Sequence, residues 1–318
     1  MRTVLIGFFC TAGSVFSQTD SIAPYIQKID GKISTQIFAL DNSNSFKIDY
    51  QSENTKVNVV PNKRTTLNVG VNYDFISFSF GFAPDVFADN RNNRDSKMFS
   101  TSLNLFPGRI VQHFDLYYQK GMSLDVAGSD AGIYLKNLKS LKIGGSTSYL
   151  FNPNYSFRAI AMQDEKQLRS AGSFAPGISY YYTQIDGTKV ENMGGQIHFI
   201  DVAVNPAYYY TWVLGGNFRF AAGLSAGAGI TWTIDEPETM SAALYQGSVM
   251  LAPGYNSKTW FFGIYGKYTY ADHKSDVAVN ISDSVTMLTA FVGYRFDAPD
   301  FLSSEMSNVK QKLKKQHK

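Results

Sequence analysis

Histidines are the side chains in this 318-residue sequence best suited to acid–base or metal chemistry, and there are four of them. His113 and His198 lie in separate segments, His273 falls in a polar stretch expected to be a solvated external loop, and His317 stands next to the last residue. No two of them have the spacing of a metal-binding pair, and the sequence contains no His-Glu-x-x-His motif and no glycine-rich phosphate loop. The single cysteine, Cys10, has no second cysteine to pair with. We therefore predict that the protein has no metal site and no cofactor.

A hydrolase site would need one histidine beside one serine. His113 could face Ser100 or Ser102 on a preceding strand, and His198 could approach Ser179. The simpler interpretation is that both histidines line the interior or the rim of a barrel. We predict no catalytic residue and no enzyme activity, and keep a barrel lipid hydrolase as an alternative.

Five charged residues fall on the polar phase of alternating segments and are expected to point into a barrel: Asp115, Arg158, Arg219, Lys267 and Arg295. Charges in a low-dielectric interior must be paired or hydrated. They would either form an ion network across a closed lumen, or line a partly cationic path that favours anionic or zwitterionic solutes. The sequence leaves both interpretations open.

The stretch Gln163–Ser173 combines charge with irregularity and lies just before Pro176-Gly177. Its polar residues are Asp164, Glu165, Lys166, Arg169, Ser170 and Ser173. Such a stretch is commonly a solvated loop. The alternative, which we adopt as a hypothesis, is a segment that folds inward as a plug or gate of the lumen.

These residues must be positioned by strands, because apolar side chains recur at every second position over many short segments. The pattern is present at 65–73, 78–82, 101–105, 114–118, 141–149, 218–232, 260–268 and 288–296. A β-sandwich also alternates in this way. Apolar faces that end in aromatic residues, such as Tyr73, Tyr149 and Trp232, instead favour the strands of an outer-membrane barrel.

The connections between these segments are of two kinds. Tight ones fall near residues 74, 107–108, 152–154, 215–216 and 256–257, and long polar ones at 84–96, 120–137, 185–197 and 272–284. Short periplasmic turns and longer external loops produce this contrast. An even strand number requires one spanning strand each from 33–59 and 156–184. We predict an all-β, transmembrane antiparallel β-barrel of about twelve strands, with fourteen as the alternative.

Composition and the N-terminus agree with this fold. Charged residues make up only 17% of the chain, against roughly 25% in an ordinary soluble domain, whereas aromatic residues make up 15%. The net charge of +3 gives no reason to expect nucleic acid as a partner. Residues 1–17 resemble a secretory signal peptide whose removal would also remove Cys10. We predict export to the outer membrane, with a periplasmic segment at 18–32, the barrel at 33–296 and a basic periplasmic tail at 297–318.

The tail has five lysines in its last nine residues, and Phe301, Met306, Val309 and Leu313 have roughly helical spacing. A short basic helix there would contact anionic lipid, peptidoglycan or a periplasmic protein. The other interpretation is a solvated, disordered tail.

Several segments together resemble a known family. They are Pro61-Asn62 with Thr65–Leu67 and Gly70, Asp115–Gln119, Tyr149–Asn152, Phe157–Ala159, Gln163–Phe174, Gly254–Asn256 and Gly293–Phe296. This pattern resembles the domain-of-unknown-function 4421 family, exported proteins of Gram-negative bacteria regarded as outer-membrane barrels. The resemblance covers residues 45–296 and implies a location and a fold. It implies no activity, because none is assigned to the family.

For function, the sequence predicts a narrow channel, transport or accessory barrel with a polar, partly cationic lumen. A closed barrel that acts as a structural or assembly partner is the first alternative, and the lipid hydrolase is the second. The expected partners are outer-membrane lipid and lipopolysaccharide, and a small polar or anionic solute.

Overall fold

The computed structural model describes most of the barrel and little of the two ends of the chain. The described residues are 25–50, 55–61, 65–74, 76–87, 95–126, 133–160, 165–190, 195–235, 238–274, 279–302, 304–306 and 308. The predicted signal peptide, Asp164, His317 and the lysine-rich end of the tail lie outside these ranges. Within the described part of the chain, no helix is long and apolar enough to cross a membrane.

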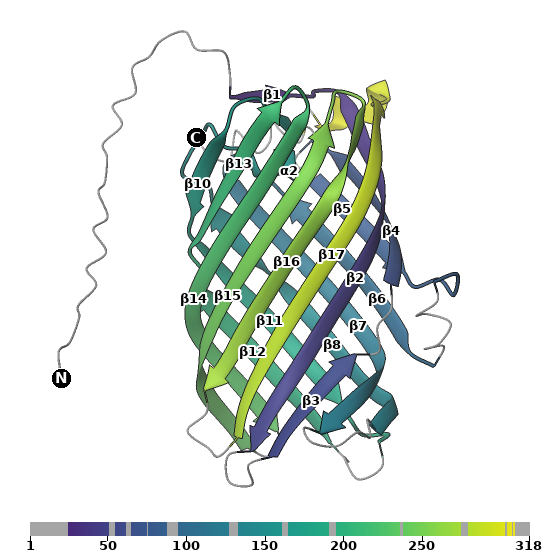
Figure 1. Ribbon diagram of the computed structural model, residues 1–318, viewed down its shortest axis with the longest axis vertical. Coiled ribbons are helices and arrows are strands. Elements are labelled where there is room, and N and C mark those ends of the chain that lie inside the picture. The colour runs from purple at the N-terminus through teal and green to yellow at the C-terminus, as the bar shows by residue number, and fades with distance from the viewer. Residues whose placement is uncertain are drawn as a thin grey trace, which may run out of the picture.

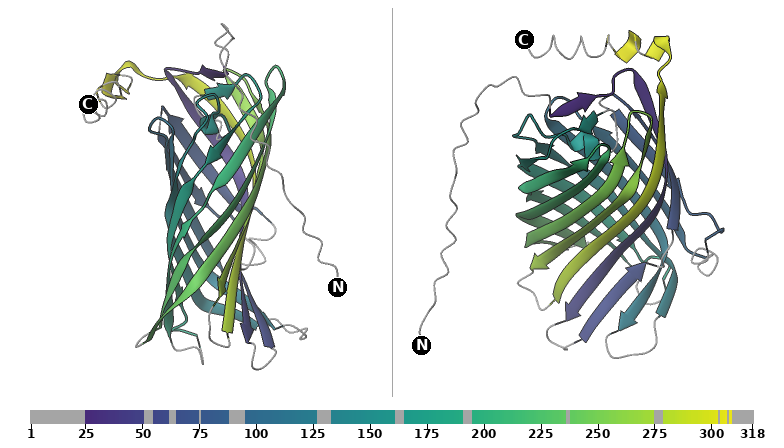
Figure 2. Two further views of the ribbon diagram at one scale, coloured as in Figure 1. Left: turned by 90° about the vertical axis from the view of Figure 1, so that its left-hand side faces the viewer. Right: turned by 45° about the horizontal axis from the view of Figure 1, so that its top comes forward.

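One antiparallel sheet closes on itself to form a barrel (Figures 1 and 2). Its strands are β2 (Lys32–Tyr50), β3 (Thr55–Pro61), β4 (Thr65–Tyr73), β5 (Ile76–Phe82), β6 (Lys97–Leu105), β7 (Ile110–Val126), β8 (Ile133–Tyr149), β10 (Ala171–Ala175), β11 (Gly177–Asp186), β12 (Gln196–Val204), β13 (Ala207–Gly215), β14 (Phe218–Asp235), β15 (Glu238–Asn256), β16 (Trp260–Lys274) and β17 (Val279–Asp297). The ring runs β14-β12-β11-β8-β7-β6-β5-β4-β2-β17-β16-β15, and pairing of β15 with β14 closes it. The described residues therefore form a ring of twelve strands, which confirms the predicted fold class and strand number.

Three further strands of the sheet, β3, β10 and β13, each continue a ring strand (β4, β11 and β12) beyond a break in that strand. β10 and β11 are separated at Pro176, and β12 and β13 at Asn205-Pro206. A proline donates no ladder hydrogen bond, so it breaks the strand at that point. β12 and β13 nevertheless pair in turn with the single strand β14, and β3 and β4 both pair with β2. Each of these pairs therefore counts as one crossing of the wall, and the predicted break at Pro176 is confirmed.

The outer face of the wall is apolar and the inner face is not. Along β14, for example, Leu224 and Ile230 are exposed on the outside, whereas Arg219 and Thr231 are buried inside. Aromatic residues cluster at the end where the short turns lie, and Trp260 packs against Tyr294 there with ring centroids 4.9 Å apart. The closed ring satisfies the backbone donors and acceptors that lipid could not. A closed ring with this apolar belt is the architecture of an outer-membrane β-barrel.

The chain enters and leaves the barrel at one end, which carries β1 (Ile26–Lys28) and the last residues of β17 (Figure 1). We call it the periplasmic end, because short turns face the periplasm in such barrels. Residues 300–302 and 304–306, at the start of the tail, are helical.

Two predicted long loops are in fact largely strand, so the prediction for 120–137 and 272–284 was wrong. β7 continues to Val126 and β8 starts at Ile133, while β17 starts at Val279. The strands β15 and β17 have 19 residues each, and about 9–11 residues suffice to cross a membrane. Strand segments with polar side chains on both faces can pair where both faces of the wall contact water. This explains why these stretches lack the apolar alternation.

At Gly121 the strand β7 changes its partner from β6 to β3. This glycine has a φ of 86°, and a Cβ atom there would lie 2.6 Å from the Tyr134 hydroxyl. The position therefore requires glycine. It marks the level at which the shorter hairpin β5–β6 ends and the taller strands continue.

The predicted tight turn at 152–154 was also wrong as a connection between two wall strands. The chain leaves the wall after Tyr149: residues 150–160 include the helix α2 (Phe157–Ile160), residues 165–170 include the short strand β9 (Glu165–Gln167), and the wall resumes at Ala171. Arg158 consequently lies on α2 and not on the polar phase of a strand, as predicted. The apolar residues Tyr155, Phe157 and Ile160 pack inside the barrel, whereas in a wall strand they would have faced lipid.

Candidate functional site

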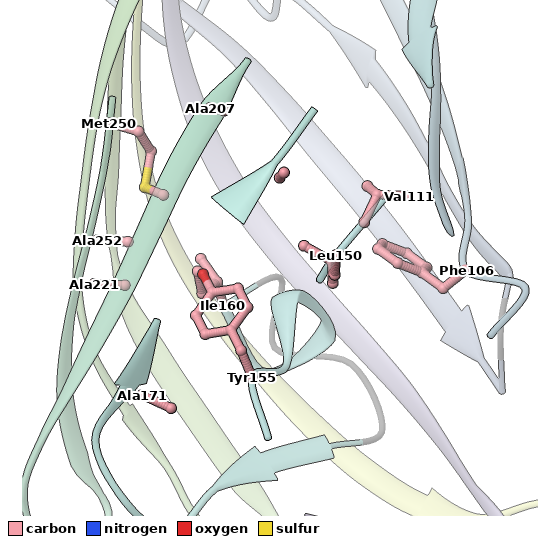
Figure 3. Close-up of a cluster of buried hydrophobic side chains, with 11 residues drawn as sticks. Phe106, Val111, Leu150, Tyr155, Ile160, Ala171, Ala207, Ala221, Met250 and Ala252 are labelled. Carbon is pink, nitrogen blue, oxygen red and sulfur yellow. The ribbon is translucent and has the colours of Figure 1, made fainter. Parts of the chain in front are cut away.

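The periplasmic end of the lumen is filled by residues 150–160 and 165–170, which we call the plug. Its apolar side chains and those of the wall form one cluster: Phe106, Val111, Leu150, Tyr155, Ile160, Ala171, Ala175, Ala207, Ala221, Met250 and Ala252. Figure 3 shows Tyr155 and Ile160 between wall residues of β14 and β15 on one side and Leu150 and Phe106 on the other. Alanines on the wall leave the space that these larger plug side chains occupy. Burial also raises the pKa of the Tyr155 hydroxyl well above its usual range.

The buried carboxylate of Glu165 holds two parts of the plug together, and its partner Arg158 links the plug to a periplasmic turn. Glu165 accepts a 2.5 Å hydrogen bond from the Ser156 hydroxyl, and Arg158 Nη1 lies 3.6 Å from Glu165 Oε1. Arg158 Nη2 donates to the backbone oxygen of Asp74 at 2.5 Å. The guanidinium thus links the plug to the β4–β5 turn.

The N-terminal residues Tyr25–Lys28, which we call the strap, hold the plug from the periplasmic side. β1 pairs with β9, and Leu168 N donates to Tyr25 O at 2.8 Å. The Gln167 amide donates to the backbone oxygens of Tyr25, Asn154 and Arg169 at 3.2, 2.8 and 3.0 Å. Its Oε1 accepts from Ser156 N at 2.9 Å. One side chain therefore joins the strap to two parts of the plug.

Cations on the wall complete the periplasmic end. Arg295, which is 1% exposed, donates to the Ser34 hydroxyl at 3.1 Å and to Ser257 O at 2.6 Å, and its guanidinium carbon lies 4.4 Å from the centre of the Phe261 ring. Lys166 of the plug donates to Asn217 Oδ1 at 2.5 Å. Partial burial and the nearby charges of Arg219 and Lys258 lower the pKa of Lys166.

Above the plug lies a cavity of about 410 Å³, which we call the chamber. Its floor includes Phe157 and Ile160 of the plug, and its wall carries Asp115 and Lys267 together with serines, threonines, glutamines and tyrosines from most ring strands. A lumen that served only to pack the barrel would be filled by side chains. The chamber is therefore the part of the lumen with room for a ligand or water.

Asp115 of β7 is a buried acid of the chamber wall, at 7% exposure. Its Oδ2 lies 2.7 Å from His113 Nε2 and 3.4 Å from the Tyr181 hydroxyl. His113 Nδ1 is 2.5 Å from Asn104 Oδ1. The histidine is thus held between an acid and an amide, and its ring nitrogens contact neither Ser100 nor Ser102.

An ion pair crosses the lumen near its outer end. Lys142 Nζ of β8 lies 3.3 Å from Asp283 Oδ2 of β17. On either arc of the ring five strands separate β8 from β17, so the two residues come from opposite walls. His273 Nε2 lies 3.5 Å from Asp283 Oδ1, and His273 Nδ1 lies 3.8 Å from Asp201 Oδ1. We call Lys142 and Asp283 the cross-lumen pair.

Beside this pair, a second apolar cluster narrows the outer part of the lumen. It is formed by Phe46, Val59, Met122 and Leu138. The plug forms the floor of the chamber, and the cross-lumen pair is part of the chamber wall.

The predicted site residues fall into two groups. Asp115 and Lys267 line the chamber, while Arg158, Arg219 and Arg295 belong to the periplasmic end. Of the predicted gate segment, Glu165 and Lys166 lie on β9, and Arg169 stacks on Tyr25 at 5.6 Å. Ser170 and Ser173 accept hydrogen bonds from Val213 N and Asn152 N, both at 3.0 Å.

Sequence reasoning missed the cross-lumen pair, Asp201 and the position of His273. His273 was expected in a solvated loop, but its side chain is 12% exposed and lies inside β16. The reason is the wrong prediction of a loop at 272–284: once β16 and β17 are extended through this stretch, the period of two places His273 and Asp283 inside. His198 bonds the Tyr182 hydroxyl at 2.7 Å through Nδ1, and no hydrogen bond joins it to Ser179.

Comparison with known proteins gives a family and a fold. The family model described as "Domain of unknown function (DUF4421)" matches residues 18–296. No curated protein matches the sequence. An outer-membrane channel from Pseudomonas putida F1 is similar in structure at 8% identity and a TM-score of 0.40, over 86% of this chain and all of that one (100%). The translocator domain of the autotransporter NalP from Neisseria meningitidis is similar at 13% identity and a TM-score of 0.40, over 82% and 88% of the two chains. The outer membrane protease OmpT from Escherichia coli is similar at 11% identity and a TM-score of 0.32, over 83% and 97%. None of their different activities is carried over to this chain.

Proposed function

The chain belongs to the family described as domain of unknown function 4421, and we propose that it is an outer-membrane transport barrel for a small polar solute in which the plug acts as the gate. In this proposal the chamber is the place where the solute resides during passage. Outer-membrane lipid and lipopolysaccharide contact the apolar belt. Cleavage of the signal peptide at residue 17 and contacts of the basic tail with a periplasmic partner are part of the same proposal.

The observation that carries this proposal is the chamber itself. A cavity of about 410 Å³ with charged and polar groups on its wall lies above the plug, an element built quite differently from the wall. Ligand sites in proteins have volumes of roughly 300–1,000 Å³, so the chamber has the size of a small-solute site.

The plug is the element suited to move. It is joined to the wall strands at Tyr149 and Ala171, and its own strand β9 pairs over only three residues with β1. Neighbouring wall strands, by comparison, pair over up to 19 residues. Displacement of the plug would break its own hydrogen bonds and expose its apolar side chains, but would leave the barrel ladder intact.

A second candidate is a closed barrel that acts as a structural partner in the outer membrane. It is favoured by the hydrogen bonds that join plug side chains to the wall and the strap: Arg158 to Asp74 O, Lys166 to Asn217 and Gln167 to Tyr25 O. In that case the chamber would hold water and the functional surface would be the periplasmic end.

Solute flux through a plug-less variant distinguishes these candidates. In this variant a short Gly–Ser linker replaces residues 153–168. Its ends can meet, because Phe151 N donates to Phe174 O at 3.1 Å across β8 and β10. The purified barrel is placed in liposomes and swelling in a pentose solution is recorded.

We expect rapid swelling for the plug-less variant and slow swelling for the wild type. A variant in which the same linker replaces the outer connection 187–195 is the matched control and should behave as the wild type. Equal, slow swelling of the folded plug-less and wild-type proteins would reject the gate and favour the closed structural barrel.

A further inference from the structure

The chamber presents two opposite charges with unused bonding capacity: Asp115 is paired with His113 through Oδ2 alone, and Lys267 has no such pair among the described residues. Asp115 is 7% exposed, and its Oδ1 atom makes no hydrogen bond of normal geometry with a described residue. Lys267 also lines the chamber, and no hydrogen bond or ion pair joins its ammonium group to any residue in the described ranges. A charged group that lies inside a protein without a bonding partner costs free energy. A ligand that bonded these groups would therefore bind with the free energy of hydrogen bonds that the fold does not make.

The two charges face each other from opposite walls. Asp115 lies on β7 and Lys267 on β16, and five strands separate β7 from β16 on either arc of the ring. They attract each other electrostatically without forming an ion pair. A ligand between them must therefore offer a cation at one end and an anion at the other.

The remaining charges of the chamber already have partners. Lys142 pairs with Asp283, and Asp201 accepts a 2.5 Å hydrogen bond from the Thr231 hydroxyl and faces His273. A purely anionic ligand would bond Lys267 and leave Asp115 opposing it. A purely cationic ligand would bond Asp115 and leave Lys267 opposing it. Charge complementarity thus selects a zwitterion.

Two neutral groups on the chamber wall also have unused acceptors. Gln119 Oε1 and Asn205 Oδ1 are buried acceptors without a donor among the described residues, and both side chains line the chamber. An ammonium group has three donors and no acceptor. It can satisfy Asp115 Oδ1 and has donors left over for neighbouring oxygens or water.

Size and the aromatic wall define the ligand further. Tyr117, Tyr181, Tyr209 and Tyr265 line the chamber and offer ring surface to an aliphatic or peptide portion. The volume of about 410 Å³ accommodates a free amino acid or a dipeptide.

We propose that the chamber is a binding site for a small zwitterion of amino-acid to dipeptide size, with the ligand carboxylate on Lys267 and the ligand ammonium on Asp115. This site rests on the proposed function, because it names the class of solute that the transport barrel would carry.

Binding is tested by isothermal titration of the purified full-length barrel and of the plug-less variant with glycyl-leucine. N-acetylglycyl-leucine, which lacks the ammonium, and glycyl-leucinamide, which lacks the carboxylate, are the matched ligands. We expect both to bind about 10- to 100-fold more weakly than glycyl-leucine, because each loses one charge-assisted bond. This comparison needs no substitution in the protein.

The protein side is tested with Lys267→Met and Asp115→Asn, with β-sheet circular dichroism as the check on folding. Lys267→Met should weaken the binding of glycyl-leucine by about 10- to 100-fold and make it nearly equal to that of glycyl-leucinamide, whereas N-acetylglycyl-leucine has lost both bonds and should bind more weakly still. Lys32→Met is the matched control, since Lys32 pairs with Asp297 at the periplasmic end, 2.8 Å away, and should not affect binding.

Equal binding of the three ligands would overturn the zwitterion site, and so would failure of glycyl-leucine to bind both the folded wild-type barrel and the folded plug-less barrel. Tight binding of N-acetylglycyl-leucine that depended on Lys267 alone would replace it with an anion site. If glycyl-leucine fails to bind but the plug-less barrel still passes a pentose, only this inference fails. If the folded plug-less barrel also passes no solute, the proposed function fails with it.

Discussion

The periplasmic end and the chamber both bury charged groups inside the same barrel, but they treat them differently. At the periplasmic end Arg295 is bonded to a hydroxyl and a carbonyl, and the Gln167 side chain makes four hydrogen bonds. In the chamber, Asp115 Oδ1 and Lys267 lack such bonds within the described residues. The charged and polar groups of the first region hold parts of the protein together, whereas Asp115 and Lys267 in the second region can still bond a ligand.

This contrast has an energetic consequence. Removing one partner of a buried, bonded charge leaves its neighbours without their bonds, whereas removing a buried charge that makes no bond relieves a desolvation cost. Matched substitutions in the two regions should therefore change the free energy of unfolding in opposite directions or by very unequal amounts.

Arg295→Met should produce the largest loss. It leaves the Ser34 hydroxyl and the Ser257 carbonyl without this donor and removes the cation from the face of Phe261. We expect the free energy of unfolding to fall by about 3 kcal/mol, measured by urea titration in lipid vesicles. If Arg295→Met lowered the free energy of unfolding by no more than Lys267→Met does, the proposed difference between the periplasmic end and the chamber would be wrong.

Gln167→Ala should loosen the plug without opening the wall. It removes hydrogen bonds to Tyr25, Asn154, Arg169 and Ser156, so we expect the local stability of the plug to fall by about 2 kcal/mol. Hydrogen exchange of residues 165–168 reports this change. Gln184→Ala is the control, because Gln184 bonds only Gln196 at an exposed site near the outer end. Unchanged exchange in the plug would show that the strap does not hold it.

Lys142→Met should have a smaller effect on stability. The cross-lumen pair is largely buried, but Asp283 keeps His273 as a neighbour. We expect a loss of about 1 kcal/mol, and a higher single-channel conductance when the substitution is made in the plug-less variant. If conductance does not change, the cross-lumen pair is not a constriction of the path.

Lys267→Met should have the smallest effect on stability, within about 0.5 kcal/mol of the wild type. The substitution removes a buried charge and breaks no hydrogen bond recorded in the described residues. The same urea titration measures it. A destabilisation comparable to that of Arg295→Met would mean that the chamber, too, is held together by its charges.

The sequence predicted the wall well, because a wall strand has a local signature. The alternation at 65–73 and 218–232 reappears as β4 and β14, and Pro176 interrupts its strand as its chemistry requires. The ring of twelve strands followed from these segments and from the parity of the turns.

The plug could not be predicted in the same way. Tyr155 and Phe157 stand two positions apart, as they would in a wall strand, but they pack in the apolar cluster inside the barrel that also contains Ala221 and Ala252. The cross-lumen pair joins residues 141 positions apart on opposite walls, and no short-range pattern encodes such a contact. Local periodicity thus specifies the barrel, whereas the site depends on contacts made after the ring has closed.

The central claim is that the plug closes the chamber from the periplasm, and the accessibility of one cysteine tests it directly. Ser248 lies on β15 in the chamber wall, with its hydroxyl 2.7 Å from that of Ser225. In a Cys10→Ser background, Ser248→Cys is exposed to a small, membrane-impermeant thiol reagent, and the rate of labelling is measured with and without the plug. We predict slow labelling of the plugged barrel and much faster labelling of the plug-less one. Equal labelling rates in the two folded proteins would contradict the claim.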